Sequence, residues 1–79
     1  MNKRPLSEIT HHITKAWPKP YFGAVPYIVA MLTCHTKDKN YIYICETAEV
    51  LVNGFLSNCS TWRGPEARAI KAELKAWVA

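Results

Sequence analysis

Apolar residues recur at intervals of three and four positions along most of this chain, and that spacing restricts it to a mainly helical fold. The first stripe lies on one side of a helix over residues 6–17 and consists of Leu6, Ile9, Ile13, Ala16 and Trp17. Pro5 suits the first turn, where its missing N–H is not needed. Pro18 follows the stripe, and the residue before a proline avoids the helical region. The pattern therefore predicts a first helix over residues 6–17.

A second helical pattern spans residues 22–33 and begins at either Phe22 or Gly23. Its stripe consists of Val25, Ile28, Val29 and Leu32. Pro26 fits a helix only within its first turn. Because the segment is apolar nearly all round, we expect it to lie in the middle of the core.

Residues 41–45 look locally like a strand, since they are rich in β-branched and aromatic residues. No second strand-like segment exists to pair with them, so the sequence favours the approach to a third helix over residues 44–58. That helix has a broad apolar face made of Ala48, Leu51, Val52, Phe55, Leu56 and Cys59. Gly54 lowers the helix propensity by about 1 kcal/mol, and we expect it to admit a close neighbour such as an aromatic ring.

The last helix follows residues 60–65, with Thr61 as its expected N-cap and Pro65 in its first turn. Its core-facing residues are Ala67, Ile70, Leu74, Trp77 and Val78. With 79 residues, the chain can build one domain with one small core. We therefore predict an all-α fold with a single domain over residues 1–79, arranged as a compact bundle of three to four short helices joined by proline-marked turns.

Charge, hydropathy and cysteine content indicate which partners and which cell compartment suit the protein. The formal net charge of +4 suits an anionic partner. No apolar run approaches the roughly 18 residues that cross a bilayer, so we expect no membrane contact. Cys34, Cys45 and Cys59 match no metal-binding spacing, and three reduced thiols favour the cytoplasm. A core this small gains from further burial, so we also expect a homo-oligomer.

Catalysis needs positioned acids, bases or nucleophiles, and the sequence offers no such arrangement. His11 and His12 are adjacent, so on a helix they point about 100° apart and cannot chelate one metal ion together. Cys34 and His35 are sequence neighbours, which is a poor geometry for proton transfer between side chains. The glycines are isolated, so there is no phosphate-binding loop. We expect a protein that is not an enzyme and that uses neither a metal nor another cofactor.

Two clusters are candidates for binding. The candidate anion site consists of Trp62, Arg63, Arg68, Lys71 and Lys75. Its cations could hold a phosphate while the indole stacks a base; alternatively, the indole fixes the helix entry and the cations form a solvated face. The weaker candidate, for a partner protein, is an aromatic corner with Tyr21, Phe22 and Tyr27. The alternative there is a rigid corner whose rings fill the core.

The motif PYFGAVPY (residues 20–27) occurs together with FLSN (residues 55–58), TWRG (residues 61–64) and ARAIKAELK (residues 67–75). In this combination the chain resembles a family of small helical proteins encoded by phages and prophages. The resemblance covers nearly the whole chain from Leu6 onward. It implies a phage origin and action in the cytoplasm of an infected bacterial cell, and it brings no catalytic residues with it.

A phage origin favours stoichiometric binding as the mode of action. Together with the basic cluster, it predicts an accessory protein for counter-defence or host takeover that sequesters an anionic nucleotide signal. One alternative is an anti-CRISPR-like inhibitor that binds a host defence protein, and another is a small nucleic-acid-binding protein. A compact pocket around Trp62 and Arg63 suits a nucleotide, whereas an extended strip of Arg68, Lys71 and Lys75 suits a polyanion.

Overall fold

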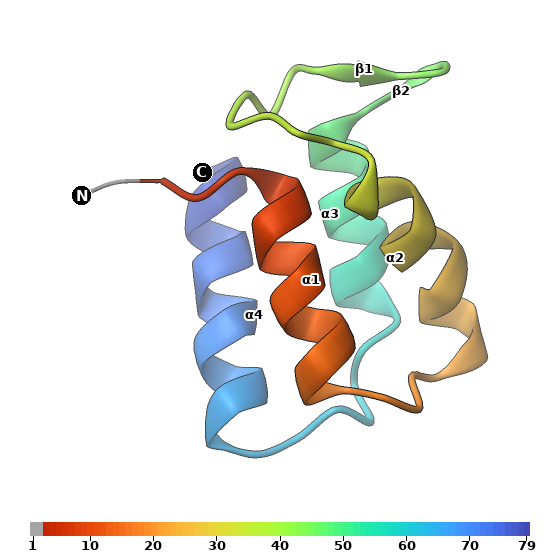
Figure 1. Cartoon of the computed structure of the whole chain (residues 1–79), viewed down its shortest axis with the longest axis vertical. Coiled ribbons are helices and arrows are strands. Elements are labelled where there is room, and N and C mark those ends of the chain that lie inside the picture. The colour runs from red at the N-terminus through yellow and green to blue at the C-terminus, as the bar shows by residue number, and fades with distance from the viewer. Residues whose placement is uncertain (1–2) are drawn as a thin grey trace.

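The computed structural model describes residues 3–79 and shows a mostly helical chain (Figure 1). Its α-helices are α1 (Leu6–Ala16), α2 (Val25–Leu32), α3 (Ala48–Ser57) and α4 (Pro65–Val78). A 3-10 turn, η1 (Phe22–Ala24), leads into α2, and two short strands, β1 (Ile42–Tyr43) and β2 (Glu46–Thr47), precede α3. The prediction of a mainly helical fold is confirmed.

The helices enclose one apolar core. α2 packs against α1 and α3, and α4 packs against the same two helices from the other side (Figure 1). The radius of gyration is 11.3 Å, close to the roughly 11.6 Å expected of a compact chain of this length. Large, fully buried side chains come from every one of these helices and include Leu6, Ile9, Ile13, Met31, Val52, Phe55, Ile70, Leu74 and Trp77.

The prediction that residues 41–45 form the approach to a helix is wrong. These residues contain β1, which pairs antiparallel with β2, so that Tyr43 lies opposite Glu46 in a tight hairpin. The missed partner strand is only two residues long, and Glu46 is a poor strand former. A strand of two residues is too short to show the alternation of apolar and polar residues by which strands are recognised in a sequence.

The third helix accordingly begins later than predicted, at Ala48. The hydroxyl of Thr47 accepts a hydrogen bond from the N–H of Val50 at 3.3 Å, which caps the helix. The N–H of Ala48 donates to the carbonyl of Tyr41 at 2.8 Å, and this bond fastens the hairpin to the start of α3.

α2 does not lie in the middle of the core, contrary to the prediction from its composition. Ile28 and Met31 are buried, whereas Val25 and Val29 are 40% and 57% exposed. A segment that is apolar on all sides gives no periodic signal to show which side faces solvent. α2 therefore covers the core with one face and leaves an apolar face open.

Gly54 has the close aromatic neighbour that the sequence predicted. The ring of Tyr27 lies across the glycine, so that a Cβ added there would lie 2.5 Å from Cζ of the ring. This contact lets α2 and α3 approach each other at the level of Gly54.

The expected N-cap of the last helix, Thr61, is wrong. α4 begins at Pro65, and its N-cap is Gly64 with a φ of 111°. That backbone conformation is open to glycine and unfavourable for other residues. The glycine therefore turns the chain sharply before Pro65 starts the helix.

Candidate functional site

The loop that follows α1 and the loop that precedes α4 meet at one end of the molecule (Figure 1). The rings of Trp17 and Trp62 stack with centroids 5.3 Å apart and planes 6° apart. A Cβ added to Gly23 would lie 2.8 Å from Oδ1 of Asn58, so these two residues are also in close contact. We call residues 17–24 together with residues 58–64 the two-loop end. The structure thus brings the PYFGAVPY motif against the end of the FLSN motif through Gly23 and Asn58, and Trp17 against Trp62 of the TWRG motif.

The tryptophan stack forms the inner layer of the two-loop end. Trp62 is only 5% exposed, and Phe55 meets both indoles edge-on at centroid distances of 6.3 Å. The Nζ of Lys71 donates a hydrogen bond to the carbonyl of Trp62 at 2.5 Å. Because the indole of Trp62 is buried against Trp17, it has little surface left to stack a base. The position of Trp62 fits the alternative given in the sequence analysis, in which the indole fixes the entry into the last helix, α4.

The outer layer of this end carries two other aromatic rings. Phe22 is 78% exposed, and Tyr21 beside it is 43% exposed, with ring centroids 4.7 Å apart. Tyr27, the third member of the predicted aromatic corner, packs on Gly54 instead. The corner is therefore divided, with Tyr21 and Phe22 exposed at this end and Tyr27 packed on α3.

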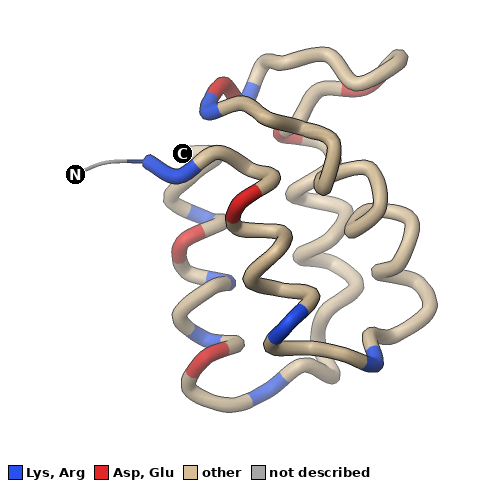
Figure 2. The backbone as a smooth tube through the Cα atoms, in the orientation of Figure 1, with Lys and Arg blue, Asp and Glu red and all other residues tan. Residues whose placement is uncertain are grey.

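The two loops that carry these rings contain cations and no carboxylates. Lys19 and Arg63 are exposed in the two loops, and Lys15 lies in the last turn of α1. The sequence has no Asp or Glu in residues 9–37 or in residues 50–65. Figure 2 shows blue segments at this end of the molecule, together with one red segment at the start of α4, where Glu66 lies. The two-loop end is consequently positive as well as aromatic.

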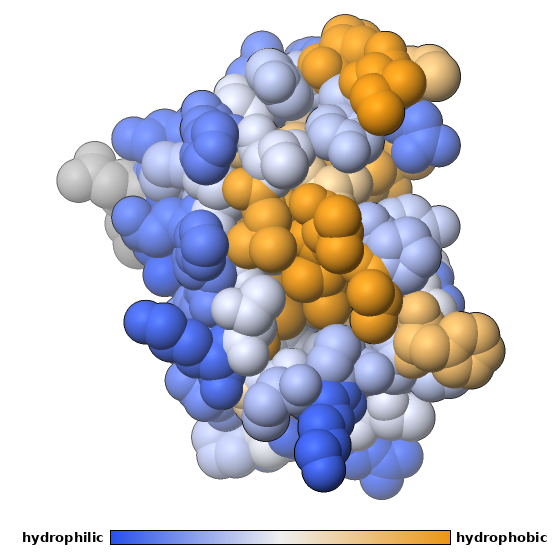
Figure 3. Space-filling model, turned by 45° about the vertical axis from the view of Figure 1, so that its right-hand side comes forward, coloured by the Kyte–Doolittle hydropathy of each residue, from blue (hydrophilic) through white to orange (hydrophobic). Residues whose placement is uncertain are grey.

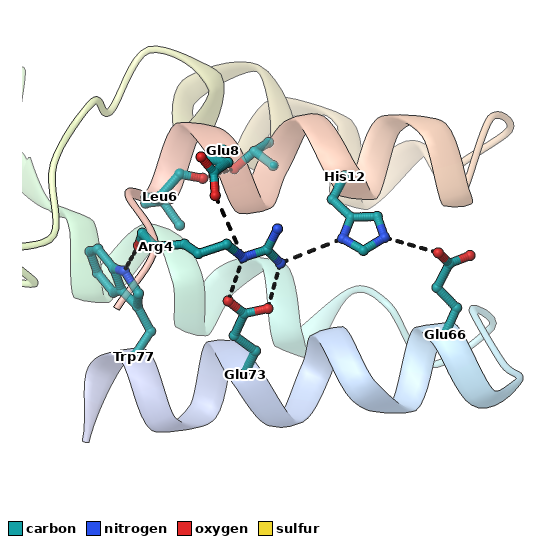
Figure 4. Close-up of polar contacts among 8 residues, drawn as sticks. Arg4, Leu6, Glu8, His12, Glu66, Glu73 and Trp77 are labelled. Carbon is teal, nitrogen blue, oxygen red and sulfur yellow. Dashed lines mark hydrogen bonds and ion pairs between the residues drawn. The ribbon is translucent and has the colours of Figure 1, made fainter. Parts of the chain in front are cut away.

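Glu66, which follows the second loop by two residues, is engaged in a polar network between α1 and α4 (Figure 4). His12 Nε2 lies 2.9 Å from Oε2 of Glu66, and His12 Nδ1 lies 3.5 Å from Nη2 of Arg4. A guanidinium can only donate, so these partners fit a neutral imidazole with its proton on Nε2. Glu66 is thus directed toward α1, away from the two loops.

The same network contains a bidentate ion pair. Arg4 Nε and Nη2 donate to the two carboxylate oxygens of Glu73 at 2.7 and 2.5 Å. The hydrogen bond from Arg4 holds the pKa of Glu73 below its usual value. Glu8 adds a longer contact to Arg4 at 3.9 Å. The network occupies both glutamates of α4 and leaves the cations of this helix without acidic partners.

Arg68, Lys71 and Lys75 form a separate basic stripe on α4. They lie at offsets of zero, three and seven, on the side of the helix away from Glu66 and Glu73. Arg68 and Lys75 are exposed, and within residues 3–79 none of the three makes an ion pair. From Arg68 to Lys75 the helix rises roughly 10.5 Å. The predicted anion site is therefore divided: Arg63 lies in the two-loop end, Lys71 reaches that end through its hydrogen bond to Trp62, and Arg68 and Lys75 lie exposed along α4.

The three cysteines are free thiols, and one of them, Cys45, is exposed. Cys34 and Cys59 are buried, and burial raises the pKa of both thiols. No cluster of three or more metal-ligating side chains occurs in the described part of the chain. Across residues 3–79, no helix is long and apolar enough to cross a membrane.

Sequence reasoning missed Lys19 and Asn58 as members of the site. Lys19 lies between two prolines, which indicated only the end of the first helix. Asn58 was predicted only as the last residue of the third helix. Comparison with models of known protein families gave no match, and comparisons with curated proteins and with solved structures gave none either.

Proposed function

We propose that this protein binds a nucleotide-type ligand at the two-loop end, without catalysing a reaction on it. The observation that carries the proposal is the exposed ring of Phe22 at the same end as the exposed cations Lys19 and Arg63, with no carboxylate in either loop. In the bound state the phosphate contacts Arg63 and Lys19, and the base stacks on Phe22.

Each part of this assignment has a physical basis. A guanidinium binds a phosphate through two parallel N–H donors. Stacking of a base on an exposed aromatic ring contributes about 1–3 kcal/mol per base. Phe22 contributes little to the core because most of its surface faces solvent. Its ring is therefore free to take part in binding.

Two sources share this ligand chemistry, a free nucleotide and a single-stranded nucleic acid. The first corresponds to sequestration of an anionic nucleotide signal, and the second to a small nucleic-acid-binding protein. The resemblance to phage-encoded proteins implies a phage origin, and for such a protein either activity would serve counter-defence or host takeover in an infected cell. Phe22 replaces Trp62 as the proposed stacking residue in both cases.

Fluorescence anisotropy with a labelled oligothymidylate tests the proposal. Phe22→Ala is expected to weaken binding roughly 5- to 150-fold, the loss of one stacked base. Arg63→Gln is expected to make the salt dependence shallower by about 0.7 in the slope of log K against log salt. Competition with unlabelled mononucleotides and cyclic dinucleotides separates the two ligand sources, because only a nucleotide-sequestering protein would prefer them to the oligomer.

Matched controls lie at the other end of the molecule. Tyr41→Ala removes an exposed ring, 42% exposed against 78% for Phe22, and Lys37→Gln removes one exposed cation. Neither change should alter the affinity for the oligomer by more than about twofold, the scale of a surface substitution remote from the site. If the control variants lose as much affinity as Phe22→Ala and Arg63→Gln, or if no nucleotide ligand binds at all, the proposal is wrong.

A further inference from the structure

The basic stripe of α4 extends beyond the nucleotide-sized site at the two-loop end. Arg68, Lys71 and Lys75 lie along one side of the helix, and Figure 2 shows them among the blue segments of α4. Like charges three and four residues apart on a helix repel each other and destabilise it. The two glutamates of α4 do not relieve this repulsion, because they bind His12 and Arg4 instead. The stripe therefore does not stabilise the helix, and an anion from outside the chain would balance its charge.

The stripe adjoins the second loop of the two-loop end. The ammonium group of Lys71 donates a hydrogen bond to the carbonyl of Trp62, and it keeps two further N–H donors for an anion. Burial raises the pKa of the Cys59 thiol, and the positive charges of Lys71 and Lys75 oppose that rise. Both ammonium groups therefore lie within electrostatic range of Cys59, at the start of the second loop.

The exposed ring of the proposed nucleotide site lies next to the same part of the second loop. Phe22 precedes Gly23, and Gly23 is in close contact with Asn58. Asn58 and Cys59 are neighbours in the chain, so the start of this loop contacts the turn that carries Phe22 and also lies near the stripe. An extended ligand can therefore reach from the ring to the stripe across the second loop.

No comparable charged route leads from Phe22 over α2 or the hairpin. Residues 20–36 and 40–45 contain no Lys or Arg. Figure 3 shows orange apolar surface on the side of the molecule that α2 and the hairpin form, where Val29 and Ile44 are among the exposed side chains. A polyanion would lose hydration on this surface without gaining a cation. The stripe of α4 therefore sets the direction that a long anionic ligand takes.

We propose that the ligand of this protein is a single-stranded nucleic acid that runs from Phe22 across the second loop and along the stripe of α4. This inference rests on the proposed function and selects a strand of several nucleotides over a free nucleotide. A base in a single strand has a free face that can stack on Phe22, whereas the bases of a duplex are stacked on one another. The phosphates contact Arg63 and the cations of the stripe. An acidic peptide offers charge to the stripe but no base to the ring.

The residues beside the stripe predict contact with the strand's backbone and no reading of its sequence. Ala69, Ala72 and Ala76 are exposed on α4 beside the cations, and a methyl group has neither a donor nor an acceptor for a base edge. The size of the molecule limits how much of a strand it can contact. Its longest extent is 29 Å, which a strand at roughly 3.4 Å per nucleotide crosses in at most about eight nucleotides.

Fluorescence anisotropy with labelled oligothymidylates of two and of about eight nucleotides tests the strand path. With concentrations counted per nucleotide, the longer strand is expected to bind more tightly, because only it reaches the stripe. Arg68→Gln and Lys75→Gln should each reduce its salt slope by about 0.7, which is a loss of about fivefold for each tenfold decrease in salt. Neither variant should weaken binding of the short strand. Both positions are exposed, so the melting temperature should not fall.

Lys37→Gln is the matched control, since it also removes one exposed cation but lies at the other end of the molecule. It should leave the affinities for both strands within about twofold of the native values. If the long strand binds no more tightly than the short one while Phe22→Ala weakens both, the strand path is wrong and the nucleotide site stands. Absence of binding by strands and mononucleotides alike would reject both proposals.

Three further outcomes would also overturn the strand path. The first is an equal loss of affinity for both strands in the stripe variants. The second is displacement of the long strand by an equal concentration of poly-glutamate of the same charge, which would assign the stripe to an acidic protein partner. The third is tighter binding of a DNA duplex than of the single strand at the same salt concentration.

Discussion

The ring of Tyr27 on α2 lies directly over Gly54 on α3, and a Cβ on that glycine would overlap the ring. The overlap sets two physical effects against each other at one position. Alanine has a higher helix propensity than glycine by about 1 kcal/mol. Forcing extra volume into a packed contact costs about 1–3 kcal/mol.

Gly54→Ala is therefore expected to destabilise the protein, although α3 itself would gain helix propensity. Urea unfolding followed by circular dichroism measures the change. In a Tyr27→Ala background the ring is absent, so the same substitution should become neutral or stabilising by up to about 1 kcal/mol. An equal effect of Gly54→Ala in both backgrounds would show that the ring does not lie where the structure places it.

The second prediction concerns the stacked pair Trp17 and Trp62. Trp62→Ala is expected to cost about 3–5 kcal/mol, because it empties a buried site between Trp17 and Phe55. Trp62→Phe should cost less and should reduce the near-ultraviolet circular dichroism that arises from the stack. A folded Trp62→Phe variant that keeps its nucleotide affinity supports Phe22 as the stacking residue, whereas a large loss of affinity at unchanged stability would return that role to Trp62.

The third prediction is the acid response of the network between α1 and α4. The pKa of Glu73 in the folded state lies below its ordinary value of 4.5 because Arg4 donates to it. The ion pair therefore contributes stability above about pH 4.5, and this contribution is lost as the pH falls through the pKa of the folded state. Glu73→Gln should lower the melting temperature at neutral pH and flatten its dependence on acid pH.

Glu8→Gln provides the control for this experiment. Glu8 is more exposed than Glu73 and lies farther from Arg4, at 3.9 Å. Its substitution should change the acid response less than Glu73→Gln does. Identical melting curves for Glu73→Gln and the native chain from acid to neutral pH would contradict the assigned pair.

The sequence was most informative where one side of a helix is polar. α1 and α4 each have an apolar side and a polar side, so their buried stripes could be predicted, including Ile9, Ile70 and Trp77. α2 has no polar side, and its open face could not be predicted from spacing. The hairpin was missed because Ile44 occupies a turn position that a glycine or asparagine would have marked.

The candidate site was predicted in pieces. Arg63 and the pair of Tyr21 and Phe22 were singled out as members of separate clusters, and their common location follows from the Trp17–Trp62 stack and the Gly23–Asn58 contact. Both contacts join residues that are more than thirty positions apart. Local sequence patterns do not predict contacts between residues this far apart. The common location of the two clusters therefore appears only in the folded structure.

Binding at the two-loop end is the central claim, and nuclear magnetic resonance tests it most directly by locating the ligand. Titration of a ¹⁵N-labelled sample with oligothymidylate or a mononucleotide should shift the amide signals of residues 19–23 and 58–64 first and most. Shifts in the Phe22→Ala variant should be weaker at the same ligand concentration. Shifts confined to the basic stripe of α4 or to α2 and the β1–β2 hairpin, or an unchanged spectrum at saturating ligand, would contradict the claim.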